Sequence, residues 1–335
     1  MMRKIAAFAV AAVIALAACQ APRAGGQPSG SAGASATPNF AGKTLNLATG
    51  PAGGVYIVYG AGIADVLSKR LGVTASPQVT PASVDNMKLI RDGKADLALT
   101  LSDTAFDAVK GQATFAPPEK PVPAKALAVM YTNFTHVVVR DGIGVSTVAD
   151  LKGKRVSVGA AGSGTEIIAN RVLEAYGMTQ ADLSAQKLAV QASADALRDG
   201  KIDAFFWSGG LPTAAVIDLV NAASVKVKLL DHTDILAKMQ QKYPGVYYET
   251  KIAANTYKND KEVKVIGVAN LLVVPATFDK ALAKAILATL FDAKADLAKI
   301  HAEANNLTLE NASKGSPIDY HEGAIEFYKE KGVMK

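Results

Sequence analysis

The side chains best suited to bind a small molecule lie in five short, polar, glycine-rich stretches of the chain. Each stretch stands between an expected strand and an expected helix. The free N–H groups and the positive end of a helix favour a carboxylate or phosphate at such a position. The stretches are residues 49–54, 81–86, 102–104, 162–166 and 209–213, and their candidate hydrogen-bonding side chains are Ser83, Asn86, Ser102, Ser163 and Thr165.

Helix capping is the alternative role for these residues. Ser163-x-x-Glu166 has the spacing of a capping box, and Ser83 is placed as an N-cap residue. Taken singly, each stretch fits a cap better than a ligand site. Five stretches divided between two lobes favour a cleft instead, because ligands of open α/β sheets lie beyond the carboxyl ends of the strands.

Sequence patterns of catalysis and metal binding do not emerge from the chain. Ser163 lacks the Gly-x-Ser-x-Gly frame of a nucleophile elbow. The four histidines are scattered and show no metal-ligand spacing. We therefore expect no catalytic residue, no metal and no cofactor. Two alternatives remain open: an exported α/β hydrolase or transferase that uses Ser163, and a surface lipoprotein without a small ligand.

A six-residue motif occurs twice and predicts two similar lobes. The copies are Arg91-Asp92-Gly93-Lys94-Ala95-Asp96 and Arg198-Asp199-Gly200-Lys201-Ile202-Asp203, and an apolar run follows each. In both, a helical pattern ends at Gly and a buried strand begins after the last Asp. The copies lie too far apart for a solenoid, whose repeats span roughly 20–50 residues. They favour an α/β fold of two lobes with largely parallel sheets.

The beginning of the chain predicts export and a lipid anchor. Arg3 and Lys4 precede an apolar stretch over residues 5–18, which is shorter than the about 20 apolar residues of a membrane-spanning helix. Cys19, the single cysteine, follows Leu-Ala-Ala at the position of the acylated residue in a bacterial lipobox. We expect a signal peptide over residues 1–18 and a lipidated, flexible tether over 19–42. The protein would then be extracytoplasmic, in the periplasm or at the cell surface.

The charge and the cysteine content limit the classes of partner and of fold that we expect. Removal of Arg3 and Lys4 with the signal peptide lowers the net charge from +6 to +4. The basic residues are scattered and do not cluster with aromatic ones, so we expect no nucleic-acid partner. A single cysteine excludes an internal disulfide, and the fold must rest on its hydrophobic core.

Seven stretches of the globular part, in order and at compatible spacing, carry a resemblance to a known family. They are Thr49–Tyr56, Ser83–Asn86, Asp150–Gly159, Gly162–Glu166, Tyr243–Gly245, Asn255–Tyr257 and His321–Ala324. Over residues 45–332 the chain resembles the TAXI family, the extracytoplasmic solute receptors of one class of TRAP transporter. The resemblance implies a two-lobe periplasmic-binding-protein type II fold with a hinge and an inter-lobe ligand cleft. It also implies a small organic anion (glutamate, 2-oxoglutarate or a similar dicarboxylate), delivered to a TRAP membrane permease that an ion gradient drives.

Residue by residue, the resemblance and the polar stretches together define a candidate ligand-binding set. Trp207 ends the second repeated strand, where small or aliphatic residues are common in the family. It would either pack on the ligand or seal its lobe. The full set is Gly54, Tyr56, Ser83, Asn86, Ser102, Ser163, Thr165, Trp207, Gly209, Gly210 and Thr213.

The expected organisation is a monomer that closes on its ligand. Lobe 1 would comprise residues 43–138 and 264–335, and lobe 2 residues 139–263. The chain would cross between them twice, along strands at Ala126–Met130 with His136–Arg140 and at Val265–Val274. We expect hinges at Val137–Asp141 and Asp260–Gly267.

Overall fold

Ten strands, joined through their edges, form the framework that positions the site. The computed structural model describes residues 39–335, so the predicted signal peptide, the lipidation site at Cys19 and most of the tether lie outside the described residues. The strands are β1 Thr44–Ala48, β2 Thr74–Gln78, β3 Leu97–Leu101, β4 Ala124–Arg140, β5 Arg155–Ser157, β6 Ser184–Gln186, β7 Ala204–Gly209, β8 Val227–Leu229, β9 Tyr247–Ile252 and β10 Val263–Pro275. Their order is β2-β1-β3-β10-β4-β7-β5-β6, with β8 on β4 and β9 on β10.

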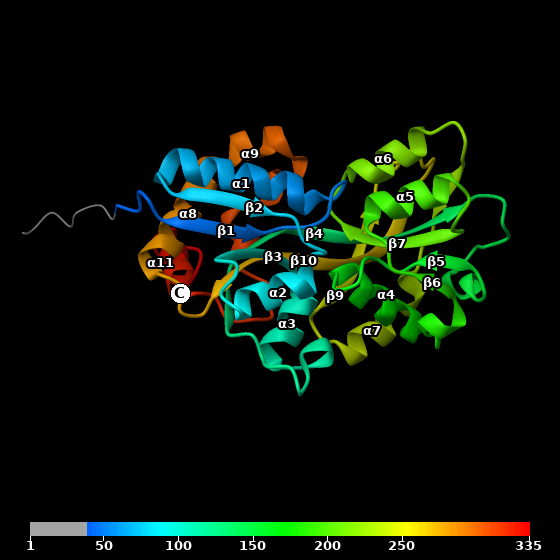
Figure 1. Cartoon of the computed structure of the whole chain (residues 1–335), viewed down its shortest axis with the longest axis horizontal. Helices are drawn as coiled ribbons and strands as arrows, with labels where there is room; N and C mark the ends of the chain where they lie inside the picture. The colour runs from blue at the N-terminus through cyan, green and yellow to red at the C-terminus, as the bar shows by residue number, and fades with distance from the viewer. Residues whose placement is uncertain (1–38) are drawn as a thin grey trace, which may run out of the picture. The chain divides into compact units, whose positions relative to one another are not determined.

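Helices cover both faces of this framework (Figure 1). They are α1 Val55–Leu71, α2 Ser83–Arg91, α3 Ser102–Lys110, α4 Gly164–Ala175, α5 Val190–Arg198, α6 Ala214–Asn221, α7 Leu236–Lys242, α8 Lys280–Asp292, α9 Lys294–Ile300, α10 Leu309–Ala312 and α11 Glu322–Glu330, with a 3₁₀ helix, η5, at Ala302–Asn306. Across residues 39–335, none of the helices combines the length and the apolar character that a membrane crossing requires.

Two lobes, each with a core on both faces of its strands, confirm the predicted α/β fold. In lobe 1, strands β1, β2 and β3 are parallel, with α1, α8 and α11 packed on one face and α2 and α3 on the other. In lobe 2, strands β5, β6 and β7 are parallel, with α4 and α7 on one face and α5 and α6 on the other. Phe40, only 7% exposed, belongs to the core of lobe 1, so the folded part begins inside the predicted tether.

The lobes are joined by β4 and β10, and the crossing lies earlier on β4 than the sequence analysis places it. β4 is one strand of 17 residues, where the analysis expected two strands with a break between them. It pairs with β7 of lobe 2 from Phe134 to Val139, which places Val137 inside lobe 2 and not at its boundary. β10 pairs with β9 up to Val268 and with β3 from Asn270 onward. We therefore place the crossings at 131–133 and 267–269.

The repeated motif forms the same corner in each lobe. α2 and α5 end at the Arg of their copies, and Gly93 and Gly200 follow with φ of +66° and +74°, a left-handed conformation that favours glycine. The last Asp then anchors the neighbouring strand. Asp96 accepts a hydrogen bond from the N–H of Asn46 at 2.7 Å, and Asp203 accepts one from the N–H of Arg155 at 2.9 Å.

Candidate functional site

A small cavity lies between the two lobes, beyond the carboxyl ends of the parallel strands. Its volume is about 30 Å³, room for about two water molecules. The structure is thus a closed form, and a larger solute requires the lobes to separate. The cavity is lined by Pro51, Gly54, Val55, Tyr56, Pro81, Ala82, Ser83, Leu101, Tyr131, Asn133, Gly159, Ala160, Ser163, Gly164, Thr165, Leu188, Ala189, Val190, Trp207, Ser208 and Gly209.

Four helices begin at the wall of this cavity, two from each lobe. The first residues of α1 and α2 line it from lobe 1, and the first residues of α4 and α5 line it from lobe 2. Each helix N-terminus carries roughly half a positive elementary charge and N–H groups without an intrahelical partner. The helix termini therefore contribute a positive potential to the cavity although, within residues 39–335, no Asp, Glu, Lys, Arg or His side chain lines it.

Three of these four N-termini have no side-chain cap. The N-cap residues of α1, α2 and α5 are Gly54, Ala82 and Ala189, and none of them forms a capping hydrogen bond within the described part of the chain. Only α4 is capped, because Ser163 accepts a hydrogen bond from the N–H of Glu166 at 3.1 Å. A bound anion would supply the missing acceptors.

Two buried tyrosines add hydroxyl groups that have no hydrogen-bond partner among the described residues. Tyr56 is 8% exposed and Tyr131 is 3% exposed, and both line the cavity. Burial raises the pKa of both phenols above their usual value, so they stay neutral. A buried hydroxyl without a partner is costly, and a ligand oxygen would satisfy it.

One wall of the cavity consists of polar residues that are hydrogen-bonded to one another. Asn133, on the crossover strand β4, accepts a hydrogen bond from the Asn270 amide of β10 and lies 3.4 Å from the hydroxyl of Ser208. The N–H of Ser208 donates to the hydroxyl of Thr165 at 3.2 Å. The Thr165 hydroxyl keeps its own hydrogen for a further acceptor. These hydrogen bonds connect β4, β10, β7 and α4 at the wall of the cavity.

Trp207 both lines the cavity and seals its lobe. Its indole N–H donates to the Thr213 hydroxyl at 2.9 Å, and its ring belongs to the core of lobe 2. The ring also packs against Gly54 of lobe 1, where an added Cβ would lie 3.1 Å from it. Trp207 is therefore placed to seal its lobe and also to contact a solute in the cavity.

Seven of the eleven candidate residues line the cavity, namely Gly54, Tyr56, Ser83, Ser163, Thr165, Trp207 and Gly209. The other four, Asn86, Ser102, Gly210 and Thr213, do not line it. A buried side chain whose hydrogen bonds are used inside the protein has none left for a solute, which applies to Asn86 and Thr213. In this closed form none of the four residues is placed to contact a solute.

The reasons differ among the four. The amide of Asn86 donates to the carbonyls of Thr49 and Leu99 at 2.6 and 2.7 Å and accepts from a third group. Thr213 is occupied by the indole of Trp207. Gly210 packs against Glu303 and Tyr131 behind the wall.

Ser102 is the fourth of these residues. It is the first residue of α3 and is 2% exposed. Its neighbour Leu101 lines the cavity in its place.

Sequence reasoning missed the contribution of the crossover strand and of the start of α5. Tyr131 and Asn133 lie in the segment that the sequence analysis treated as a break between strands. Ala189 carries no polar side chain, so nothing in its type marks it as the N-cap residue of a helix at a site. The start of α2 was predicted, but its N-cap residue is Ala82 and not Ser83. Ser208 lies between two candidate residues, Trp207 and Gly209, and its hydroxyl type was a usable signal.

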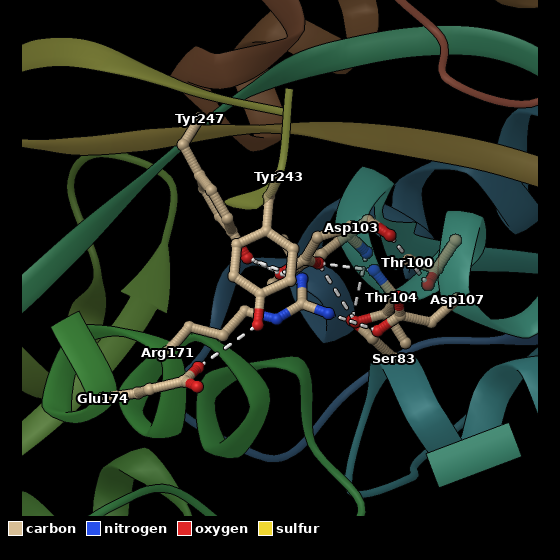
Figure 2. A network of polar contacts seen from close by, with 10 residues as sticks. Ser83, Thr100, Asp103, Thr104, Asp107, Arg171, Glu174, Tyr243 and Tyr247 are labelled. Carbon is tan, nitrogen blue, oxygen red and sulfur yellow. Dashed lines mark hydrogen bonds and ion pairs between the residues drawn. The ribbon is translucent and has the colours of Figure 1, made fainter. Parts of the chain in front are cut away.

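A buried ion-pair cluster joins the lobes beside the cavity (Figure 2). Arg171 of α4 donates to Asp107 of α3 at 2.5 Å and lies 3.4 Å from Asp103 of the same helix. The hydroxyl of Tyr247 accepts from Arg171 at 2.8 Å and donates to Asp103 at 2.6 Å. The ring of Tyr243 covers the guanidinium, 4.0 Å from its centre. We name Arg171, Asp103, Asp107 and Tyr247 the inter-lobe cluster.

The charged groups of the inter-lobe cluster are almost completely withdrawn from water. The side chains of Arg171, Asp103 and Asp107 are 7%, 0% and 8% exposed. Burial raises the pKa of Asp107, and the neighbouring Arg171 opposes that rise. Because the acids and the arginine belong to different lobes, the ion pairs exist only when the lobes are closed.

Contacts on the other face of the sheet, between α1 and α6 in Figure 1, also join the lobes. The N–H of Ala215 donates to the carbonyl of Gly53 at 3.3 Å. The buried carboxylate of Glu303 in η5 accepts from the N–H of Leu211 at 2.5 Å. Burial raises the pKa of Glu303. The cavity is thus enclosed by inter-lobe contacts on both sides.

A buried histidine supports the wall of lobe 2 from behind. His136 lies 2.8 Å from the carbonyl of Phe134 through Nδ1 and 3.2 Å from the hydroxyl of Tyr257 through Nε2. Because the Phe134 carbonyl can only accept, Nδ1 carries the proton of the neutral ring, and the Tyr257 hydroxyl donates to Nε2 while it accepts from the N–H of Thr213 at 2.8 Å. Burial lowers the pKa of His136 to about 4, which keeps the ring neutral.

Comparison with solved structures finds the same two-lobe architecture. A periplasmic transporter has 14% identity and a TM-score of 0.52, with 87% of this chain and 93% of that chain covered. A protein of Bordetella bronchiseptica RB50 has 18% identity and a TM-score of 0.51, with coverage of 87% and 89%. A binding protein component of an ABC phosphonate transporter from Pseudomonas aeruginosa has 10% identity and a TM-score of 0.50, with coverage of 78% and 79%. Identities this low concern the fold alone.

The sequence itself also matches the model of a protein family. The match extends over residues 47–332, which include both lobes, both crossover strands and every residue that lines the cavity. The chain belongs to the NMT1-like family.

Proposed function

We propose that this protein is an extracytoplasmic solute-binding protein that closes its two lobes on a small organic anion. The observation that carries the proposal is the meeting of four helix N-termini, three of them without a side-chain cap, at one inter-lobe cavity. The orphan hydroxyls of Tyr56 and Tyr131 point to the same need for ligand oxygens. Carboxylates, and the related phosphonates and sulfonates, present such oxygens in a compact, charged group.

Binding is favoured over catalysis by the environment of Ser163. Its hydroxyl donates to the carbonyl of Ala160 at 2.6 Å and accepts from the N–H of Glu166, the bonds of a helix cap. Neither bond goes to a base that could activate a nucleophile. The hydrolase or transferase alternative therefore has no supporting geometry at this residue.

The resemblance to TAXI receptors supports the finer assignment. On that basis the protein would deliver its solute to a TRAP membrane permease driven by an ion gradient. A lipid on Cys19 would hold it at the membrane, and it would act as a monomer. Glutamate, 2-oxoglutarate and similar dicarboxylates are the solutes that the resemblance suggests.

A thermal-shift screen of the purified mature protein tests the binding function. The panel comprises carboxylates, phosphonates and sulfonates of two to eight carbons, with neutral sugars and polyamines as controls. A solute that binds only the folded state raises the melting temperature, by an amount equivalent to about 2.7 kcal/mol at a hundredfold excess over Kd. A response to sugars or polyamines alone, or to no compound, would refute the proposal. Formation of a product from a panel compound would favour the enzyme instead.

Transport by vesicles that carry the cognate permease tests the finer assignment. Uptake of the solute identified by the screen should require the purified receptor and should stop when ionophores collapse the ion gradients. Uptake that instead requires ATP inside the vesicles would identify an ABC-type partner and would leave the binding function intact.

A further inference from the structure

We propose that the site accepts organic anions without a positively charged group, such as 2-oxo and 2-hydroxy acids, and excludes the matching α-amino acids. The inference rests on the proposed function and names the class of its solute. It follows from the lining of the cavity, where helix N-termini contribute positive charge and no carboxylate is exposed, although Asp85, Glu166, Asp103 and Glu303 lie behind the wall. It separates glutamate from 2-oxoglutarate, which the sequence left together.

The charges at the cavity wall come from the backbone alone. Four helix N-termini meet there, and the 21 lining residues include no Asp or Glu that could face an ammonium group. The polar side chains of the wall are hydroxyls, one amide and the indole of Trp207, and the hydroxyls of Tyr56 and Tyr131 have no partner among the described residues. An anion gains charge-assisted hydrogen bonds from this arrangement, whereas an ammonium group meets a field of the wrong sign.

The acids nearest to the wall are occupied elsewhere. Asp103 lies behind Tyr56 and is bonded to Tyr247 and Arg171 in the inter-lobe cluster. Glu303 lies behind Tyr131 and accepts hydrogen bonds from Leu211 and Asn306. Neither acid lines the cavity, so neither is placed to pair with a solute.

Lobe closure should strengthen the preference for oxo and hydroxy acids over amino acids. Inter-lobe contacts enclose the cavity on both sides, so a solute held between the closed lobes exchanges most of its hydration for contacts with the wall. An ammonium group that is buried without an acid keeps neither its hydration nor a counter-charge. A keto or hydroxyl oxygen at the same carbon instead accepts a hydrogen bond from an available donor, such as the Tyr131 hydroxyl.

Calorimetric titration with matched solutes tests the inference on the native sequence. Each triad shares one carbon skeleton: pyruvate, L-lactate and L-alanine; 2-oxoglutarate, L-2-hydroxyglutarate and L-glutamate; and 4-methyl-2-oxopentanoate, its 2-hydroxy acid and L-leucine. For the skeleton that binds, we expect the oxo or hydroxy acid to bind about a hundredfold more tightly than the amino acid, or better. An amino acid that binds as tightly as its oxo acid would overturn this inference and leave the binding function standing. Silence of all nine acids would overturn this inference, whereas the binding function would fall only if the whole thermal-shift panel were silent as well.

A charge-only substitution provides a second, independent test. Asn133 is 2% exposed and lines the cavity, so Asn133→Asp adds a carboxylate without a change of size. We expect the oxo acid to bind at least about tenfold more weakly than it binds the native protein. The difference in affinity between the oxo acid and the matching amino acid should become smaller or change sign. Asn305→Asp makes the same charge change at an exposed position in η5 and should leave both affinities unchanged. If this difference in affinity is the same in Asn133→Asp and Asn305→Asp, the inference is contradicted. If Asn133→Asp does not fold, the titrations of the native protein still decide.

Discussion

Removal of the arginine of the inter-lobe cluster should weaken solute binding without a matching loss of folding stability. Arg171→Met deletes the charge and keeps an unbranched apolar side chain under the ring of Tyr243. In the closed form it leaves Asp103 and Asp107, at most 8% exposed, without a cation. Breaking a buried ion pair from one side costs about 3–5 kcal/mol.

Because the inter-lobe cluster lies between the lobes, its loss should affect the equilibrium of lobe closure and not that of unfolding. The two acids lie on α3 of lobe 1, and Arg171 lies on α4 of lobe 2. When the lobes separate, water replaces the arginine around the acids, so the penalty falls on closure. Since each 1.4 kcal/mol is a factor of ten, the solute should bind about a hundredfold more weakly or worse.

The pH dependence gives this effect a signature of its own. Burial raises the pKa of Asp107 in the closed form. Protonation of Asp107 removes one of the uncompensated charges, so the affinity of Arg171→Met should recover as the pH falls toward that raised pKa. The native protein has its arginine and should show no such recovery.

Three measurements decide the outcome: calorimetric affinity, small-angle scattering with and without solute, and urea unfolding without solute. Arg155→Met is the matched control, because the Arg155–Asp203 pair is 45% and 16% exposed and lies entirely within lobe 2. We expect the control to close normally and to bind with native affinity. Native affinity in Arg171→Met, or a loss of unfolding free energy as large as the loss of binding free energy, would refute the reasoning.

Four further variants test other parts of the structure. Gly164→Ala would place a Cβ 2.7 Å from the Ser83 hydroxyl of the opposite lobe, so calorimetry should show at least about tenfold weaker binding while urea unfolding shows no loss of stability. Asn86→Ala breaks buried hydrogen bonds within lobe 1 and should cost about 3 kcal/mol of unfolding free energy, measured in urea; a native midpoint would contradict its buried role. His136 is neutral in the folded protein down to a pKa of about 4, whereas the unfolded side chain takes up a proton near 6.5, so stability should fall as the pH drops through that window, and His136→Gln should reduce this slope by up to about 1.4 kcal/mol per pH unit. Cys19→Ser should abolish labelling by a fatty-acid analogue and release the protein from the membrane fraction; retention without label would exclude the lipid anchor.

The fold followed from local signals that the sequence carries at short range. Gly93 and Gly200 end their helices because a left-handed residue is needed there, and the apolar runs after Asp96 and Asp203 form the buried central strands. Such choices depend on neighbours a few residues away, so the two-lobe α/β architecture was predictable. The crossover strand was not, because Thr132 and Asn133 are polar residues inside a strand, and only their pairing with Ala269 and Val268 of β10 makes them part of it.

The candidate site was likewise predictable only where local sequence patterns define it. The helix starts at Gly54, Ser83 and Ser163 were predictable, because glycine and hydroxyl residues between a strand and a helix are a local pattern. Sequence alone could not tell that Asn86 turns inward, since its partners Thr49 and Leu99 are set by packing. Nor could it pair Arg171 with Asp103, which is 68 residues away on a different lobe. Local sequence patterns thus indicated which segments supply helix N-termini and hydroxyl groups to the candidate site. Which of their groups face the cavity, and what holds it closed, depends on contacts between distant segments and was decided by the tertiary structure.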